Sequence, residues 1–159
     1  MTSFGLGYEV DLMLCLDNFD QKLGVGIMYA GHALFGAEQE GGFDIGIYGL
    51  ELYGVKGQYR FWGPDNAVSP YVSLGLGVSK FSTPEITSGT TVIEEGKSAF
   101  SFRLRPEIGI DLGGFVISAA YMTPMSYTIE SDMGDYDGSA GAFTISIGYR
   151  KYIDISNLF

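Results

Sequence analysis

The sequence has one cysteine, one histidine and only nine basic residues among 159. The lone Cys15 excludes an internal disulfide. Because 19 acidic residues give a net charge of −10 and no basic patch is present, we expect no nucleic-acid partner. No apolar run reaches the roughly 18 residues that a transmembrane helix needs, and the longest lies near Phe115–Met122. If the chain enters a membrane, it must do so with strands.

An export signal is also missing from the first residues. Residues 1–16 contain Glu9 and Asp11 and have no basic start, whereas a secretory signal begins with positive charge before its apolar stretch. An exported protein with this beginning would be in a processed or truncated form.

Glycine and aromatic residues are abundant, with 24 Gly, 11 Tyr and 11 Phe against 18% charged residues. This composition is too hydrophobic for a disordered chain. The length corresponds to one domain, so we expect residues 1–159 to form a single unit.

Apolar and small or polar residues alternate with period 2 along much of the chain. This pattern is typical of strands whose two faces meet different surroundings. No amphipathic helix is evident, so the sequence predicts an all-β fold. Seven segments show the alternation: 5–14, 22–35, 53–62, 72–79, 99–112, 115–127 and 142–150.

The links between these segments alternate in length. Short links at 16–21, 63–69 and 113–114 take turns with longer ones at 36–42, 82–98 and 130–139. This arrangement predicts an up-and-down antiparallel barrel with short turns at one rim and long loops at the other. Membrane barrels have this form, and so do soluble barrels of the lipocalin type that bind a small apolar ligand.

The composition of the polar face favours the membrane barrel. That face consists mostly of Gly, Ala and Ser, which suit a narrow interior, and its few charges are balanced, as buried ions require. Its four acids and five bases leave 15 of the 19 acidic residues for loops, rims and termini. We therefore predict an interior ion network of nine residues: Glu9, Asp11, Lys56, Arg60, Arg103, Arg105, Glu107, Asp111 and Arg150.

The apolar face carries the features of a surface in contact with lipid. A Lys or Arg at mid-depth there would cost about 2–4 kcal/mol, and the clearest strands have none. Aromatic residues gather near the strand ends, as in interfacial girdles. They are Tyr59, Phe61, Trp62 and Tyr71 beside one turn, and Phe81, Phe100, Tyr121 and Tyr127 toward the loops.

Residues 52–78, LYGVKGQYRFWGPDNAVSPYVSLGLGV, resemble the outer-membrane β-barrel domain family of small, porin-family, OmpA/OmpX-like barrels. A strand ending in a tyrosine–aromatic pair is followed by a short polar turn, Pro-Tyr-Val and a glycine-rich strand. The stretches FRLRPEIG at 102–109 and GAFTISIGYR at 141–150 are similar to later strands of the family. The resemblance implies a Gram-negative outer membrane, and a terminal strand 142–150 that the barrel-assembly machinery binds. The chain departs from the family by continuing after Tyr149.

The number of strands conflicts with this resemblance, because bacterial single-chain barrels have an even number and at least eight. We therefore expect eight strands. Either a strand that would precede Met1 is missing, which we favour, or Phe43–Trp62 divides near Gly49 into two. Pro106 cannot donate to a strand ladder, so we also predict a bulge there.

Motifs for catalysis or ligand binding are weak. Asp132, Asp135 and Asp137 resemble part of a calcium loop, but Met133 and Thr144 occupy two ligand positions, so we expect weak divalent-ion binding at most. His32 is expected at the loop-side rim without a catalytic partner. We predict no enzyme activity, no cofactor and no metal centre.

These observations predict a non-enzymatic integral outer-membrane barrel with a plugged, ion-paired interior and acidic surface loops for structural or interaction roles. A soluble or periplasmic lipocalin-like carrier is the alternative. An open pore fits less well, since eight strands leave room only for side chains.

Overall fold

The computed structural model describes residues 2–16, 20–35, 48–63, 66–82, 86–88, 91–94, 98–129 and 136–154. Within these ranges no helix is long and apolar enough to cross a membrane. The strands are β1 (Thr2–Cys15), β2 (Leu23–Phe35), β3 (Tyr48–Arg60), β4 (Ser69–Ser82), β5 (Ile86–Ser88), β6 (Thr91–Glu94), β7 (Ser98–Leu112), β8 (Phe115–Ile129) and β9 (Tyr136–Asp154).

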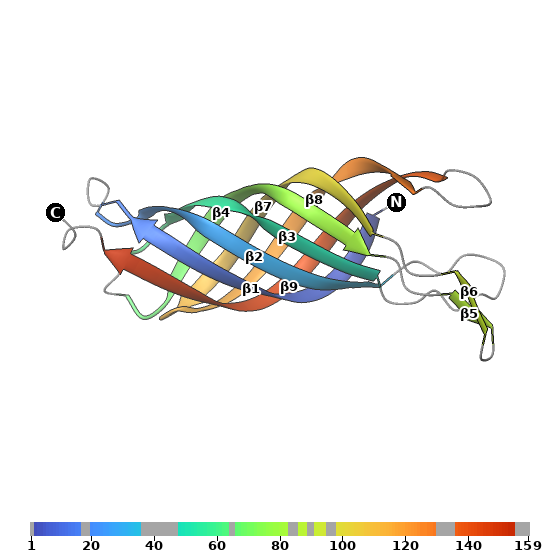
Figure 1. The fold of residues 1–159 in the computed structure, drawn as a ribbon. Helices are drawn as coiled ribbons and strands as arrows, with labels where there is room; N and C mark the ends of the chain where they lie inside the picture. The colour runs from blue at the N-terminus through green and yellow to red at the C-terminus, as the bar shows by residue number, and fades with distance from the viewer. Residues whose placement is uncertain are drawn as a thin grey trace.

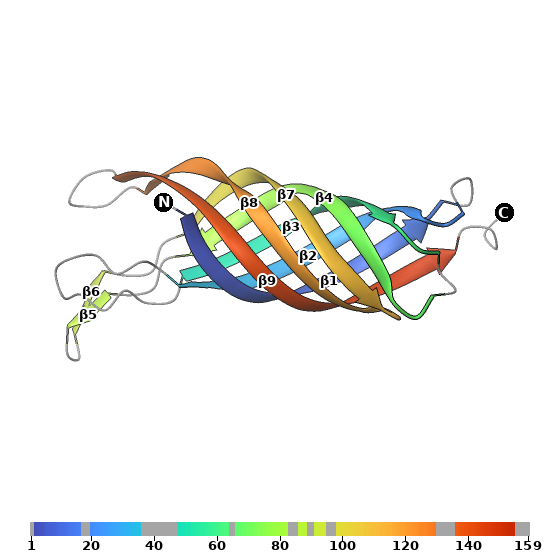
Figure 2. The ribbon, with the colours of Figure 1, turned by 180° about the vertical axis from the view of Figure 1, so that it is seen from behind.

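Seven of these strands close into a barrel in the order β1-β2-β3-β4-β7-β8-β9 (Figures 1 and 2). The predicted all-β barrel is therefore confirmed. Strands β5 and β6 pair with each other and lie beyond one end of the barrel (Figure 1). We call this end the loop rim, since β2, β4 and β8 end there and β3, β7 and β9 begin there, and the opposite end the turn rim.

The barrel closes through a parallel pair, which corrects two predictions. β1 and β9 run in the same direction and pair from Thr2–Gly141 to Cys15–Asp154. The barrel thus has seven strands rather than eight, and its sheet is mixed rather than wholly antiparallel. The reason is geometric: when an odd number of strands alternates in direction, the first and the last point the same way.

The proposed division of a strand near Gly49 is also wrong. β3 begins at Tyr48, and Gly49 pairs with Ala33 on β2 and with Ser82 on β4, so no turn occurs at this position. Residues 43–47 lie outside the described part of the chain.

The tight turn predicted at Gly113–Gly114 is present. Both glycines have positive φ angles, 72° and 104°, which side chains with a Cβ rarely adopt. The Gly114 N–H donates to Asp111 Oδ1 at 2.8 Å, so the side chain before the turn fixes its backbone. This turn aligns β7 and β8 at the turn rim.

The alternation of the sequence sets the two faces of the wall. Along β4 every second side chain from Ser69 to Phe81 is buried in the barrel, while those between face outward. Tyr71 and Phe81, expected in the aromatic girdles, therefore point inward, and only 1% and 7% of their surfaces are exposed. The side chain of Tyr127 lies outside the described part. Glycine makes room for the inward Tyr71, since a Cβ at Gly109 would lie 2.6 Å from the Tyr71 hydroxyl oxygen.

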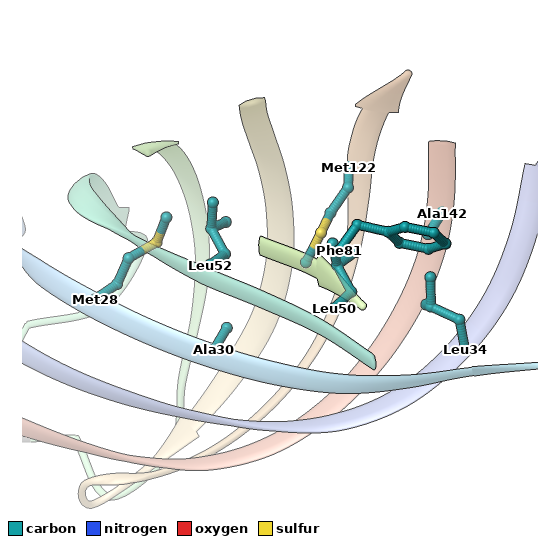
Figure 3. Close-up of a cluster of buried hydrophobic side chains, with 8 residues drawn as sticks. All are labelled: Met28, Ala30, Leu34, Leu50, Leu52, Phe81, Met122 and Ala142. Carbon is teal, nitrogen blue, oxygen red and sulfur yellow. The ribbon is translucent and has the colours of Figure 1, made fainter. Parts of the chain in front are cut away.

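An apolar cluster fills the interior toward the loop rim. Figure 3 shows its side chains converging inside the barrel. Tyr48 packs against it by stacking on Phe81, with ring centroids 5.5 Å apart. The cluster consists of Met28, Ala30, Leu34, Leu50, Leu52, Phe81, Met122 and Ala142.

The irregularity predicted at Pro106 takes another form. The β4–β7 ladder passes through the Leu74–Pro106 pair without a register shift. A shift occurs instead on β8, between Met122 and Met125. The β7–β8 pairing ends at Glu107–Ala120, directly beside Pro106, because proline has no N–H to continue it.

Candidate functional site

All nine charged residues of the predicted interior network lie inside the barrel, and at most 5% of any of their surfaces is exposed. They come from β1, β3, β7 and β9, and Asp111 lies at the turn-rim end of β7. The same alternation that turns apolar residues outward turns these side chains inward. The structure brings six of the nine into direct ionic contact and places the other three elsewhere along the barrel axis.

Lys56 lies at the centre of these six residues. Its Nζ is 2.9 Å from Asp11 Oδ2, 3.0 Å from Glu107 Oε1 and 3.5 Å from Glu9 Oε1. Three carboxylates from β1 and β7 therefore surround one ammonium group from β3. In the strand order of the barrel, β3 lies between β1 and β7.

Two guanidinium groups complete the arrangement. Arg105 Nη2 lies 2.8 Å from Glu9 Oε2, and its Nη1 contacts Glu107 Oε2. Arg150 Nη2 lies 2.6 Å from Asp11 Oδ2 and 3.2 Å from Glu9 Oε1. We call Glu9, Asp11, Lys56, Arg105, Glu107 and Arg150 the ion cluster.

The charges of the ion cluster cancel, since three acids meet three bases. Each carboxylate contacts at least two cations, so none is available as an unpaired base. The side chains of these ion pairs have no exposed surface, so their charges do not contact bulk water. Removing one partner would leave a buried charge uncompensated, which typically costs about 3–5 kcal/mol.

Two uncharged side chains that the sequence analysis did not assign to the interior support the ion cluster. Tyr71 donates its hydroxyl to Glu107 Oε1 at 2.8 Å, and the Arg150 guanidinium lies 4.2 Å from the centre of the Tyr71 ring. Ser118 donates to Glu9 Oε2 at 3.3 Å. The signal was present in the sequence, because Tyr71 and Ser118 occupy the same alternation as their buried neighbours.

The other three charged residues have separate surroundings. Near the turn rim, Arg60 stacks on the Tyr152 ring at 4.2 Å and donates to the Gln21 carbonyl at 2.8 Å. Asp111 accepts hydrogen bonds from Tyr152 and from the Gly114 N–H. Arg103 lies toward the loop rim, where its Nε donates to Ser79 Oγ at 2.8 Å. These residues extend the polar interior without joining the ion cluster.

His32 lies inside the barrel rather than at its rim, with 5% of its surface exposed. Its Nε2 is 2.9 Å from Ser146 Oγ, which also accepts from Arg105 Nη2 at 3.4 Å. The histidine thus belongs to the packed interior.

The acidic loop lies mostly outside the described residues. Asp132 and Asp135 are not described, and Asp137 is described only as a backbone position of β9. Among the described side chains, no group of three or more His, Cys, Asp and Glu residues is arranged to hold a metal ion.

The chain matches no protein-family model, no curated protein and no solved structure. The resemblance to outer-membrane barrels therefore remains a prediction from the sequence. What the protein does must be argued from the distribution of its side chains.

Proposed function

We propose that this chain is a non-enzymatic integral β-barrel protein of a bacterial outer membrane, plugged by ion pairs and bearing acidic surface loops for structural or interaction roles. The observation that carries the proposal is the inverted polarity of the barrel. Charged residues are enclosed, while the outer wall of the described strands is made of large apolar side chains.

The outer wall is unlike the surface of a soluble protein. Thirty large apolar or aromatic side chains of the described residues are exposed, among them Phe102 at 62%, Val55 at 58% and Ile147 at 67%. Scattered exposed apolar residues are normal, but a continuous apolar surface marks contact with a membrane or another partner. Lipid is the partner that covers every side of a barrel at once.

The height of the apolar wall matches a bilayer. From Pro70 to Lys80, β4 turns Val72, Leu74, Leu76 and Val78 outward. The ten residue-to-residue steps of about 3.3 Å, tilted by about 40°, span roughly 25 Å, the height of the apolar band in membrane barrels. Lys80 then lies at the loop-side edge of this band, where an ammonium group can reach the lipid headgroups.

Polar aromatic side chains mark the same edge. The Tyr29 and Tyr53 hydroxyls donate to the Glu51 carboxylate at 3.4 and 3.2 Å, and the Tyr8 hydroxyl lies 3.1 Å from that of Tyr29. Tyrosine prefers the membrane–water interface because its ring is apolar and its hydroxyl is hydrated. The tyrosines also provide hydrogen bonds for the one carboxylate that β3 turns outward.

The filled interior favours a plugged barrel over a carrier or a pore. A lipocalin-like carrier needs an internal apolar cavity. Here the ion cluster occupies the middle of the axis and the apolar cluster packs the loop-side part. A cavity of about 250 Å³ at the turn rim has the charged Arg60 and Asp111 in its lining, so it is not the apolar cavity of a carrier. In this proposal the long connections face the outside, the short turns face the periplasm, and strand 142–150 contacts the barrel-assembly machinery.

Membrane insertion can be tested by folding the purified chain into phosphatidylcholine vesicles. We expect the protein to float with the vesicles, to resist carbonate extraction and to require detergent once the lipid is removed. We also expect no ion conductance in planar bilayers. A folded chain that is monodisperse in buffer without detergent would refute the membrane proposal and favour the carrier.

A further inference from the structure

The regular ladder between β7 and β8 covers only the turn-side half of these two strands. Paired residues run from Leu112–Phe115 only as far as Glu107–Ala120, although both strands continue toward the loop rim. On the other side of β7, the ladder with β4 continues to Ser98. The interruption therefore belongs to this seam and not to β7 itself.

Two prolines account for the interruption, and one threonine partly bridges it. Pro106 on β7 and Pro124 on β8 have no N–H to donate, and the register of β8 shifts around Pro124. Thr123 Oγ1 accepts from the Leu104 N–H at 3.2 Å and donates to the Leu104 carbonyl at 3.3 Å. One side chain thus replaces part of the missing backbone ladder.

The outer wall is hollowed beside this interruption. A groove of about 590 Å³ crosses the wall there, and Ala119 is its small outward residue on β8. The residues paired with Ala119 on either side are the larger Ile108 and Ile145. At the loop-side end the Tyr121 and Phe143 rings lie 4.7 Å apart.

The groove offers almost no polar partner to an occupant. Its outward-facing lining is apolar except for the Tyr121 hydroxyl. Glu107, Ser73 and Thr144 also line it, but all three belong to the inward face of the wall. The Glu107 carboxylate is held inside by Lys56 and Arg105.

We propose that this groove binds one hydrocarbon chain of a membrane lipid. The inference rests on the proposed function, because the wall meets lipid chains only if it lies in a bilayer. Lipid chains are as apolar as the wall, so the preference comes from packing: an ordered chain restores the contacts that the small Ala119 leaves unmade. A chain held there also covers the wall at Pro106 and Tyr121, where the regular β7–β8 ladder ends.

The test uses vesicles of phosphatidylcholine with a photoreactive diazirine in the middle of one acyl chain. After illumination, mass spectrometry compares labelling around Pro106 and Ala119 with labelling around Ile27 and Val55. Ile27 and Val55 lie on the outer faces of β2 and β3. Going around the barrel from β8, β2 is the third strand in one direction and β3 is the third strand in the other. We expect about fourfold enrichment at the groove, a ratio that corresponds to about 0.8 kcal/mol.

Two matched variants locate the site. Ala119→Phe fills the groove and should lower its labelling to the level of the opposite wall. Val55→Phe places the same ring on the opposite wall and should leave the enrichment unchanged. If Ala119→Phe does not fold, Ala119→Val is expected to reduce the enrichment in part, and the wild-type comparison decides by itself.

The outcomes separate this inference from the proposed function. Even labelling of all outward faces would overturn the groove site while supporting insertion of the barrel. Labelling of no outward face would contradict membrane insertion and the groove site together. Enrichment that persists in a folded Ala119→Phe variant would also overturn the site, since no groove remains there.

Discussion

The two halves of the barrel interior are filled in different ways by the same strands. β3 contributes Lys56 to the ion cluster and Leu52 to the apolar cluster, and β9 contributes Arg150 and Ala142 in the same way. Both halves are fully enclosed, so exposure to solvent does not explain the difference. The two halves differ in what they determine. Ion pairs determine which residues of different strands lie side by side, whereas apolar packing determines how completely the interior space is filled.

The ion cluster connects strands that are not neighbours in the sheet, and it also joins the neighbouring β1 and β9. Lys56 joins β3 to β1 and to β7 across the axis, and Arg150 binds Asp11, its register partner in the parallel β1–β9 pair. Shifting that register by one residue would turn Arg150 outward. Buried ion pairs contribute uncertain net stability, but their geometry disfavours alternative registers. We therefore infer that the ion cluster fixes the register of the closing β1–β9 pair.

The largest expected effect comes from removing a charge of the ionic half. Arg150→Met leaves Asp11 and Glu9 with one cation fewer, so we expect the free energy of unfolding to fall by about 3–5 kcal/mol. Urea titration of the vesicle-inserted protein measures this quantity. Adding Asp11→Asn should recover part of the loss, because it restores charge balance.

The neighbouring Lys151, which is exposed on the outer face, provides the control for this charge removal. Lys151→Met should leave the free energy of unfolding nearly unchanged, since exposed substitutions seldom have a large effect. Equal losses for Arg150→Met and Lys151→Met would refute the structural role of the ion cluster.

The apolar half should respond to a loss of volume. Leu52 is completely buried, and Leu52→Ala should lower the free energy of unfolding by about 3 kcal/mol through lost contacts and a residual cavity. Val55→Ala, on the outer face of the same strand, should have a much smaller effect because lipid can fill the space. The same urea titration measures both variants. If both cost the same, the apolar cluster does not act as a packed core.

The border between the two halves offers a weaker interaction. Ser146 bonds His32 on one side and Arg105 on the other. Ser146→Ala should lower the free energy of unfolding by about 1 kcal/mol, the usual net value of a hydrogen bond. Ser98→Ala, at the exposed beginning of β7, is the control and should show little loss, since the 3.4 Å contact of Ser98 with Ser82 is exposed to solvent. A loss as large as that of Arg150→Met would place Ser146 within the ion cluster.

Much of this architecture could be predicted from local pattern, because the period of 2 determines which side chains share a face. That pattern predicts Arg105 and Glu107 inside and Phe102 outside, where the structure has them. When it was continued consistently it also located Tyr71 and Phe81, which we had assigned to the aromatic girdles by their position near strand ends. Both predictions were wrong because the position of an aromatic residue near a strand end was given more importance than the alternation of inward and outward residues.

The closure of the barrel and the division of its charges could not be read in this way. The parallel β1–β9 pair follows from the strand number, and we adjusted that number to the even count of known bacterial barrels. Which six of the nine charges meet depends on the stagger between strands, since Arg103 and Arg105 share a face but bind different partners. Stagger is a property of the closed sheet rather than of any one segment.

The smallest expected effect is the coupling between the two halves. Leu52 and Arg150 belong to different clusters, so the double variant Leu52→Ala/Arg150→Met should lose the sum of the two single losses to within about 0.5 kcal/mol. The Arg150→Met/Asp11→Asn pair should instead deviate clearly from additivity, because those side chains are in contact. A coupling above about 1 kcal/mol between Leu52 and Arg150 would show that the interior responds as one unit. The distinction between a half that fixes the register and a half that fills volume would then fail.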